Sequence, residues 1–236
     1  MLKVSVLIPA LNEEGAIGVV VSELVALAGP DGKPYLDEVV VGDNGSTDRT
    51  ADVARAAGAT VGAAPVRGYG SACLAGMAHL RRRPEGPPDV VVFVDGDGSN
   101  VAAELPDLVT PIAAGRADLV IGSRVRRAEP GSLTPPQRFG NELASFMLRR
   151  LYRAETTDLG PFRAIAWPAL MQLRMEDPNY GWTVEMQVKA AKVGLRVAEV
   201  DVQNRPRIAG ESKVAGTVRG VVGAGYKIIW TILRYR

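Results

Sequence analysis

Two aspartates that flank a single glycine follow the most apolar stretch of the sequence. Residues 90–94 form that stretch and are expected to be a buried strand, and Asp95, Gly96 and Asp97 come directly after it. Carboxylates are costly to bury without partners. A divalent cation that bridges a diphosphate would be such a partner, because hard carboxylate oxygens suit Mg²⁺ or Mn²⁺. The pair therefore indicates a metal site, although a polar turn would account for the same residues.

The residues that follow the two aspartates exclude a calcium loop of the EF-hand type. That motif requires a glycine and then a bidentate acid at set distances from its first aspartate. In this chain Asn100 and Pro106 occupy those two positions. A metal that bridges a diphosphate therefore explains the aspartate pair better than a calcium loop does.

A third carboxylate, Asp43, stands at the end of a second apolar stretch. The next residues favour a turn and can cap the helix that follows; they are Asn44, Gly45, Ser46, Thr47 and Asp48. Capping accounts for the last three of them but not for Asp43. A carboxylate at this strand end can accept a hydrogen bond from an N–H on the edge of a nucleobase. Asp43 is therefore a candidate nucleotide contact.

Two further loops precede expected helices. Asn12 can serve as an N-cap, with Glu13 in a first turn where an acid complements the helix dipole. The loop that begins at Arg67 and Gly68 is not a dinucleotide fingerprint, because Cys73 occupies the place of its last glycine. No dinucleotide fingerprint and no Walker A sequence occur elsewhere in the chain. These absences argue against NAD, FAD and P-loop chemistry.

Strands and helices that alternate along the first half must position these residues. The expected strands are residues 4–8, 38–41, 59–62, 90–94 and 118–121, and the expected helices are residues 13–28, 48–57, 70–82 and 104–114. Such alternation implies a parallel, Rossmann-like sheet. Ligands of such sheets bind beyond the carboxyl ends of the strands, which is where the polar residues stand.

The second half is less regular but contains no linker, repeat or low-complexity tract. Its expected helices are residues 137–152, 182–193 and 216–236, and its expected strands are residues 158–165 and 195–202. The last helix is amphipathic, with Trp and Tyr among its apolar residues and several cations. Such a helix suits contact with a membrane surface as well as ordinary packing. We expect one α/β domain over residues 1–236.

The composition limits the classes of partner and the cellular location that we expect for this protein. Lys and Arg number 28 against 26 Asp and Glu, so the net charge of +2 does not suggest a nucleic-acid partner. No run of 18 apolar residues is present, so we expect no membrane span and a cytoplasmic protein, with the last helix as the candidate for peripheral contact at the inner face of the membrane. The single cysteine, Cys73, excludes an intrachain disulfide. An oligomer is neither indicated nor excluded.

Taken together and in this order, the motifs resemble those of family 2 glycosyltransferases. The resemblance rests on Pro9 with Asn12-Glu13, on Asp43-x-x-Ser46-x-Asp48 and on Asp95-x-Asp97. It continues into the second half, where residues 120–124, 158–163 and 205–213 look like motifs of the dolichyl- or polyprenyl-phosphate mannose and glucose synthase branch. This resemblance implies a GT-A fold, a mostly parallel sheet with helices on both faces. It divides the domain into a nucleotide-sugar-binding half, residues 1–122, and an acceptor-binding half, residues 123–236.

The same resemblance assigns roles to individual residues. Nucleotide-sugar contacts are expected at Pro9, Ala10, Asn12, Glu13, Asp43, Arg67, Gly68, Asp95 and Asp97. Metal contacts are expected at Asp95 and Asp97, with Ser99 as the candidate third contact. Phosphate groups of the donor or acceptor are expected to meet Arg124, Arg163, Arg205, Arg207, Ser212 and Lys213. Asp97 and Glu185 are the expected catalytic residues.

The acceptor decides which of these residues the reaction needs. Family members invert the anomeric centre in one displacement, and a hydroxyl acceptor requires a general base, for which Glu185 is the candidate. Glu185 could equally be a first-turn acid on a helix dipole. A phosphomonoester arrives largely deprotonated and needs cations instead, which the basic segment from Arg205 to Lys213 supplies. We therefore expect metal-dependent transfer of a hexose from a UDP- or GDP-sugar to a polyprenyl phosphate.

Three other functions compete with this expectation. The same family could use a soluble acceptor, such as a phosphorylated small molecule, a metabolite or a glycan. A sugar-nucleotide pyrophosphorylase would carry a glycine-rich loop with a basic residue after the first strand, whereas this chain has Pro9-Ala10-Leu11-Asn12-Glu13. A nucleotide-binding protein without catalysis would not need the intact pair Asp95 and Asp97.

Overall fold

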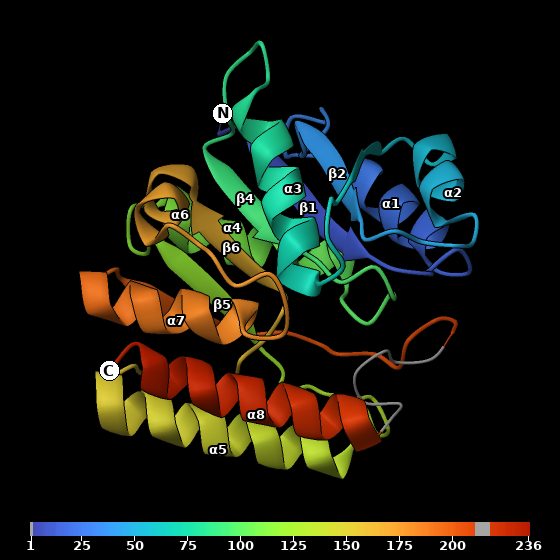
Figure 1. The fold of residues 1–236 in the computed structure, drawn as a ribbon. Helices are drawn as coiled ribbons and strands as arrows, with labels where there is room; N and C mark the ends of the chain where they lie inside the picture. Colours follow the sequence, from blue (N-terminus) through green and yellow to red (C-terminus); the bar gives the residue numbers. More distant parts are fainter. Residues whose placement is uncertain (1, 211–217) are drawn as a thin grey trace.

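One mixed sheet of seven strands organises the part of the chain that the computed structural model describes, residues 2–210 and 218–236. The strands are β1 (Val4–Ala10), β2 (Glu38–Asp43), β3 (Thr60–Ala63), β4 (Val90–Phe93), β5 (Leu119–Ser123), β6 (Arg163–Ala166) and β7 (Val197–Asp201). Their order across the sheet is β3-β2-β1-β4-β6-β5-β7 (Figure 1). Only β6 among them runs antiparallel, between β4 and β5. The predicted mostly parallel α/β sheet is confirmed.

Helices cover both faces of this sheet, as the sequence predicts. In the described residues they are α1 (Ile17–Val25), α2 (Thr50–Ala56), α3 (Tyr69–Arg81), α4 (Leu105–Ala113), α5 (Pro135–Tyr152), α6 (Trp167–Leu173), α7 (Trp182–Val193) and α8 (Val218–Arg234), with a 3₁₀ turn η1 (Ala102–Glu104) before α4. Side chains of α1 and α4 pack with one face of β1 and β4 in a single apolar cluster. Side chains of α3, α6 and α7 pack against the opposite face. The continuous apolar runs of β1 and β4 follow from this burial on both faces.

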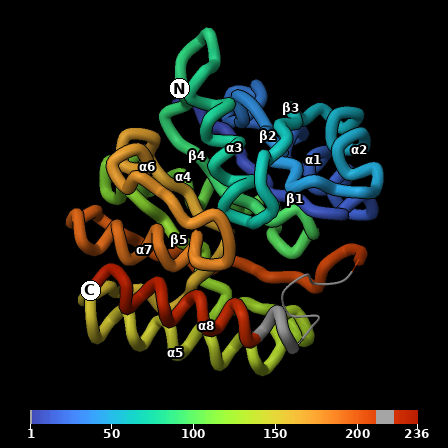
Figure 2. The backbone as a smooth tube through the Cα atoms, in the orientation of Figure 1, coloured from blue at the N-terminus to red at the C-terminus, as the bar shows by residue number. Residues whose placement is uncertain are grey.

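Three helices form a further layer below the sheet. Figures 1 and 2 show α8 lying alongside α5, with α7 between that pair and the sheet. A separate apolar cluster joins the three helices through residues such as Leu148, Val188 and Ile232. A capping box between Thr134 and Gln137 begins α5. Segments from both halves of the chain therefore meet where this layer approaches the sheet.

Local caps and boundaries differ from expectation in four places. The helix expected from residue 13 begins at Ile17, and neither it nor α2 has a side-chain cap. The strand expected over residues 158–165 is confined to β6, because Gly160 and Pro161 lie in a loop. Helix α6 was not predicted. Its signal is Pro168 in the first turn, followed by residues with high helix propensity.

Within the described residues, none of the helices combines the length and the apolar character that crossing a membrane would require.

Candidate active site

The carboxyl ends of β1, β2 and β4 open into a cleft of about 570 Å³. The cleft is lined by Pro9, Ala10, Leu11, Glu13, Asn44, Arg67, Gly68, Tyr69, Asp95, Gly96, Asp97, Gln137, Asn179, Tyr180 and Arg207. Eight of these residues were expected to bind the donor, the metal or a phosphate, and they come from segments far apart in the sequence. The parallel strands bring them together because all three strands end at the same edge of the sheet.

The two aspartates follow the carboxyl end of β4 in a short loop that is held by hydrogen bonds. The backbone N–H of Asp95 donates to Oδ1 of Asn100 at 2.9 Å, and the N–H of Ser99 donates to Oδ1 of Asp97 at 3.0 Å. Gly98 has a φ of +78°, and a Cβ there would collide with Ile208. Ser99 does not line the cleft, and its carbonyl oxygen accepts from the N–H of Arg205 at 2.9 Å. The structure therefore places Ser99 in the scaffold of the loop rather than beside the cleft.

The electrostatics of the pair favour a cation. Burial, followed by the charge of Asp97, raises the pKa of Asp95 from its ordinary value to about 7. The hydroxyl of Tyr69 donates to Oδ1 of Asp95 at 3.3 Å. A guanidinium nitrogen of Arg207 lies 2.8 Å from Oε1 of Glu13 and 3.5 Å from Oδ2 of Asp97. Arg207 is therefore a cation of the cleft itself, in contact with a carboxylate 194 positions earlier in the chain as well as with Asp97.

A divalent metal fits this donor set on its chemistry. Asp95 and Asp97 offer hard oxygen ligands, and the raised pKa of Asp95 shows that its negative charge is poorly compensated. In the described residues no three His, Cys, Asp or Glu side chains are grouped to hold a metal ion. A metal on the aspartate pair would complete its coordination with water and phosphate oxygens, as Mg²⁺ does in nucleotide sites.

The loops after β1 and β2 are hydrogen-bonded to each other. Oδ1 of Asn12, a residue with a φ of 52°, accepts from the N–H of Thr47 at 2.8 Å. The N–H of Asn12 donates to Oγ of Ser46 at 3.0 Å, and the N–H of Glu13 donates to Oγ1 of Thr50 at 2.8 Å. The expected N-cap role of Asn12 is therefore wrong, because its amide joins the two loops instead of starting a helix. This bracing holds Glu13 at the cleft.

Asp43 is partly buried at the end of β2, but the cleft is lined by its neighbour Asn44. Its two carboxylate oxygens accept from the N–H of Ser46 at 3.3 and 3.4 Å. Oδ1 of Asn44 accepts from the N–H of Gly68 at 2.9 Å and so ties the loop before α3 to the end of β2. Nucleotide binding by Asp43 remains a prediction.

Glu185 is placed differently from expectation. It is fully buried in α7 and does not line the cleft. Its carboxylate accepts from the N–H groups of Asp177 at 2.8 Å and Glu176 at 3.1 Å, and it lies 2.7 Å from Nζ of Lys189. These contacts lie inside the protein and agree with the alternative of an acid in the first turn of α7, and the expected role as a general base stays a prediction. What the sequence did not show is that the loop before α7 folds back over Glu185.

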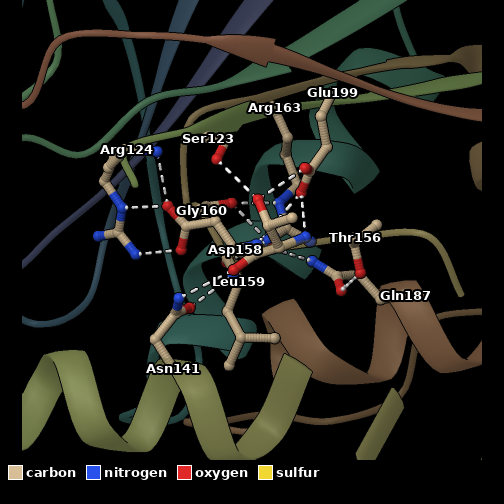
Figure 3. A network of polar contacts seen from close by, with 11 residues as sticks. Ser123, Arg124, Asn141, Thr156, Asp158, Leu159, Gly160, Arg163, Gln187 and Glu199 are labelled. Atoms are coloured by element: carbon tan, nitrogen blue, oxygen red, sulfur yellow. Dashed lines mark hydrogen bonds and ion pairs between the residues drawn. The ribbon is translucent and has the colours of Figure 1, made fainter. Parts of the chain in front are cut away.

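The side chain of Arg163 is also buried and takes part in a network of polar contacts inside the protein (Figure 3). Its guanidinium is fully buried and donates to the carbonyl oxygens of Leu159, Gly160 and Thr183. Burial lowers the pKa of Arg163 to about 10. These donors already bind backbone oxygens of the loop after Asp158 and of α7, and the expected phosphate contact stays a prediction.

The remaining expected phosphate contacts divide into three cases. Arg124 binds Asp158 through Nε at 2.8 Å and Nη2 at 2.7 Å, yet it still borders two cavities (Figure 3). Arg205 extends toward Glu23 of α1 at 3.6 Å and does not line the cleft. Ser212 and Lys213 lie outside the described residues.

An apolar groove that the sequence did not predict adjoins the cleft. It has a volume of about 470 Å³ and shares Tyr69, Gln137 and Tyr180 with the cleft. Its remaining lining is Arg124, Pro136, Phe139, Gly140, Asn141, Leu143, Leu159, Pro161, Thr183, Ala224, Gly225, Ile228 and Ile229. Most of these residues come from α5 and α8, and their small side chains, Gly140, Ala224 and Gly225, leave room between the helices.

Known proteins resemble the chain in sequence. The family model described as Glycosyl transferase family 2 matches residues 5–172. An uncharacterized glycosyltransferase of Mycobacterium tuberculosis is 38% identical over 221 residues, and the alignment covers 93% of each protein. An undecaprenyl-phosphate mannosyltransferase of Micrococcus luteus is 32% identical, over 94% of this chain and 90% of that protein.

A solved structure resembles the chain over almost its whole length. It is glucosyl-3-phosphoglycerate synthase from Mycobacterium tuberculosis, in complex with Mn²⁺, UDP-glucose and phosphoglyceric acid. The TM-score is 0.79 at 26% identity, and the match covers 99% of this chain and 79% of the solved one.

Proposed function

The chain belongs to glycosyl transferase family 2, and on that basis we propose that it transfers a hexose from a UDP- or GDP-sugar to a polyprenyl phosphate. It is a glycosyltransferase with a GT-A fold. The observation that supports a polyprenyl phosphate as the acceptor is the apolar groove that adjoins the cleft. A groove of about 470 Å³, lined mainly by apolar side chains, suits an isoprenoid chain better than a small water-soluble acid.

The donor occupies the cleft at the ends of β1, β2 and β4. Asp95 and Asp97 would hold Mg²⁺ or Mn²⁺, which when bound would supply positive charge to the departing nucleoside diphosphate. Arg207 adds positive charge beside Asp97, and Arg67 lines the same cleft. Pro9, Ala10 and Glu13 face the nucleotide from the end of β1. This assignment makes residues 1–122 the donor half and residues 123–236 the acceptor half of one domain.

The acceptor phosphate enters from the groove. One of its oxygens forms a bond with the anomeric carbon while the bond from that carbon to the diphosphate breaks, and the configuration inverts. A phosphomonoester with a second pKa of about 6 is largely ionised at neutral pH and needs no general base. The inward-facing Glu185 agrees with this chemistry, because the reaction does not depend on a carboxylate at its position. Arg124, at the edge of the groove, provides a cation for the acceptor phosphate.

The outer side of the same two helices suits a membrane surface. Six large apolar side chains are exposed there, Phe139 and Phe146 on α5 and Val222, Tyr226, Trp230 and Leu233 on α8. Lys227 and Arg234 lie over the ring of Trp230, at 4.6 and 5.0 Å. Aromatic rings beside cations are typical of interfacial helices. Peripheral contact through α5 and α8 would bring the groove to a lipid acceptor.

A soluble phosphorylated acceptor is the second candidate. The observation that favours it is the solved glucosyl-3-phosphoglycerate synthase, whose complex contains phosphoglyceric acid. Both candidates carry a phosphate. They differ in whether the apolar groove is used and in the attacking group, because a soluble acceptor that attacks through a hydroxyl requires a general base, whereas a prenyl phosphate attacks through its phosphate.

Two glycines of α8 provide the test. Gly225 lines the groove and Gly223 does not, and a Cβ at either position meets no atom within 4 Å. Gly225→Leu should therefore fill the groove without internal strain, whereas Gly223→Leu adds the same side chain elsewhere on the helix. We expect Gly225→Leu to slow transfer to farnesyl or undecaprenyl phosphate by about tenfold or more, with Gly223→Leu unchanged.

Transfer from UDP-glucose and GDP-mannose with Mn²⁺ would be measured for both variants, to each prenyl phosphate and to 3-phosphoglycerate. Turnover of 3-phosphoglycerate that neither substitution affects, without any turnover of prenyl phosphates, would replace the lipid acceptor with the soluble one. Activity on a prenyl phosphate that Gly225→Leu leaves unchanged would remove the groove from the proposal.

A further inference from the structure

The loop between α6 and α7 joins the donor cleft to the helix that borders the groove. Asn179 and Tyr180 of this loop line the cleft beside Gly68 and Tyr69. Tyr180 also lines the groove. The loop, residues 176–181, will be called the bridging loop. Its conformation decides where two side chains of the donor cleft stand.

The bridging loop is packed tightly against the loop before α3. The N–H of Ser71 donates to the carbonyl oxygen of Pro178 at 2.9 Å. A Cβ at Gly70 would collide with the carbonyl oxygen of Asp177, and a Cβ at Gly68 would collide with that of Pro178. The backbones approach each other so closely that a shift of the bridging loop must displace Gly68 and its neighbours in the cleft.

On its other side the bridging loop is held by α7 and α8. Nζ of Lys227 lies 2.9 Å from Oδ2 of Asp177, whose side chain is only 5% exposed. Oδ1 of the same carboxylate accepts from the N–H of Asn179 at 2.8 Å. The hydroxyl of Tyr235 donates to Oε1 of Glu185 at 2.9 Å, and Glu185 accepts from the N–H of Asp177 at 2.8 Å. Lys227 of α8 and Tyr235, the residue after α8, therefore hold the loop through two buried carboxylates.

The same stretch of α8 forms one wall of the groove. Ala224, Gly225, Ile228 and Ile229 line the groove, and Lys227 lies between them in sequence. A chain bound in the groove would therefore hold in place the stretch of α8 that carries Lys227, and with it the contact to Asp177. Loss of the lysine would leave a buried carboxylate without its cation, which is a strong reason for the loop to rearrange.

We propose that Lys227 and Asp177 are positioning residues that couple the apolar groove to the donor cleft. The proposal rests on the proposed function for the identity of the groove's occupant, but not for the positioning of the cleft. The ion pair holds the bridging loop so that Asn179 and Tyr180 meet the nucleotide. Because coupling between two sites is reciprocal, a chain in the groove strengthens nucleotide binding as much as a nucleotide strengthens binding of the chain.

A double-mutant cycle on nucleotide affinity tests the positioning role. Calorimetry would measure binding of UDP and GDP, each with Mn²⁺, to Lys227→Met, Asp177→Asn and the double variant. We expect each single variant to bind the nucleotide about tenfold more weakly than the wild type. The double variant should bind no more weakly than either single one, since both remove the same contact. Lys227→Arg should restore most of the affinity.

Lys192→Met is the matched control. Nζ of Lys192 donates to the backbone carbonyl oxygen of Tyr235 at 2.6 Å, so it anchors the residue after α8 without taking part in the ion pair between Lys227 and Asp177. We expect this variant to keep wild-type nucleotide affinity. Equal weakening by Lys192→Met and Lys227→Met would overturn the proposal, because any loosening of α8 would then suffice. Unchanged affinity in Lys227→Met and Asp177→Asn would overturn it as well.

Farnesyl phosphate tests the coupling separately. In the wild type we expect saturating farnesyl phosphate to raise nucleotide affinity about fivefold or more, and in Lys227→Met we expect that increase to disappear. An increase that persists unchanged in Lys227→Met would overturn the coupling. If farnesyl phosphate has no effect on any variant while the cycle behaves as expected, the proposed lipid acceptor fails and the positioning role stands.

Discussion

Asp95 and Asp158 are two aspartates whose surroundings shift their pKa values in opposite directions. Burial and the charge of Asp97 raise the pKa of Asp95 to about 7, in a cleft where its partners are a tyrosine hydroxyl and the neighbouring carboxylates. Burial alone would also raise the pKa of Asp158, but the hydrogen bonds and charge of Arg124 outweigh burial and lower it. The first carboxylate is left for a ligand, and the second is used by the fold.

The same contrast separates the donor side from the acceptor side. On the donor side, Glu13, Asp97 and Arg207 keep polar atoms at the cleft. On the acceptor side, Arg163 and Glu185 are fully buried and hold loops in place. Under the proposed function, acceptor recognition falls to the apolar groove between α5 and α8. A charged residue of a motif is thus not by itself evidence of a ligand contact, because a buried loop needs charged partners as well.

The largest loss of activity is expected when Asp97, a carboxylate of the donor cleft, is removed. We expect Asp97→Ala to reduce transfer by about a thousandfold or more, comparable to the loss of a principal electrostatic contact to the transition state. Its thermal stability should match or exceed that of the wild type, because the repulsion on Asp95 is relieved. Asp52→Ala, on the exposed side of α2, is the control. Wild-type turnover in excess EDTA would contradict the metal mechanism.

Removing Asp158 should instead reduce stability. Asp158→Ala leaves the guanidinium of Arg124 without its bidentate partner, and we expect a loss of about 3–5 kcal/mol in the free energy of unfolding. Asp95→Ala in metal-free protein should be neutral or stabilising. Urea unfolding monitored by circular dichroism measures both variants. Equal losses for the two would erase the contrast between a ligand-binding and a structural carboxylate.

The pH dependence of stability should carry opposite signs at the two positions. Between the ordinary pKa of 3.8 and about 7, the folded state keeps a proton on Asp95 that the unfolded state has released. The free energy of unfolding of the metal-free protein should therefore fall as pH rises through this window, by at most about 1.4 kcal/mol per unit. Asp158, whose pKa is lowered, contributes stability above its unfolded-state pKa and loses it only as pH falls through its folded value.

Urea titrations in EDTA at pH 5, 6 and 7 would test this for the wild type and Asp95→Asn. The variant should lack the downward slope that the wild type shows. Parallel curves for the two proteins would mean that Asp95 does not titrate in this range.

The smallest effect is expected at Asp43, which lies beside the cleft rather than in its lining. Asp43→Asn should weaken nucleotide binding by about 1–3 kcal/mol, the cost of losing a hydrogen bond to a charged group. The loss should be the same for different sugars on one base, because the contact would be to the base. Calorimetry with UDP and UDP-glucose, or with GDP and GDP-mannose, would measure it. Unchanged affinity would leave Asp43 only its hydrogen bonds to Ser46.

The sequence predicts those structural features that depend on residues close together in the chain, and it fails for features that depend on distant residues. The apolar run of β4 and the aspartates after it are adjacent in the chain, so strand, turn and metal-site prediction follow from one local segment. The parallel strand pattern then places the ends of β1, β2 and β4 at one edge, which brings Glu13 and Asp95 to one cleft. Helix α6 was missed and the strand that contains β6 was predicted to begin too early, because Gly160, Pro161 and Pro168 interrupt any regular pattern there.

The sequence by itself determined the sheet, its polar edge and the carboxylates that stand there, because strand patterning and strand-end position are properties of neighbouring residues. Only the tertiary structure decided which cations remain available and where an acceptor can lie. Arg124 meets a carboxylate 34 residues away and Arg207 meets one 194 residues away. The groove exists only because α5 and α8 pack side by side. Such pairings depend on how the whole chain closes. Arg163 is fully buried among backbone oxygens, whereas Arg124 and Arg207 pair with carboxylates and still border cavities.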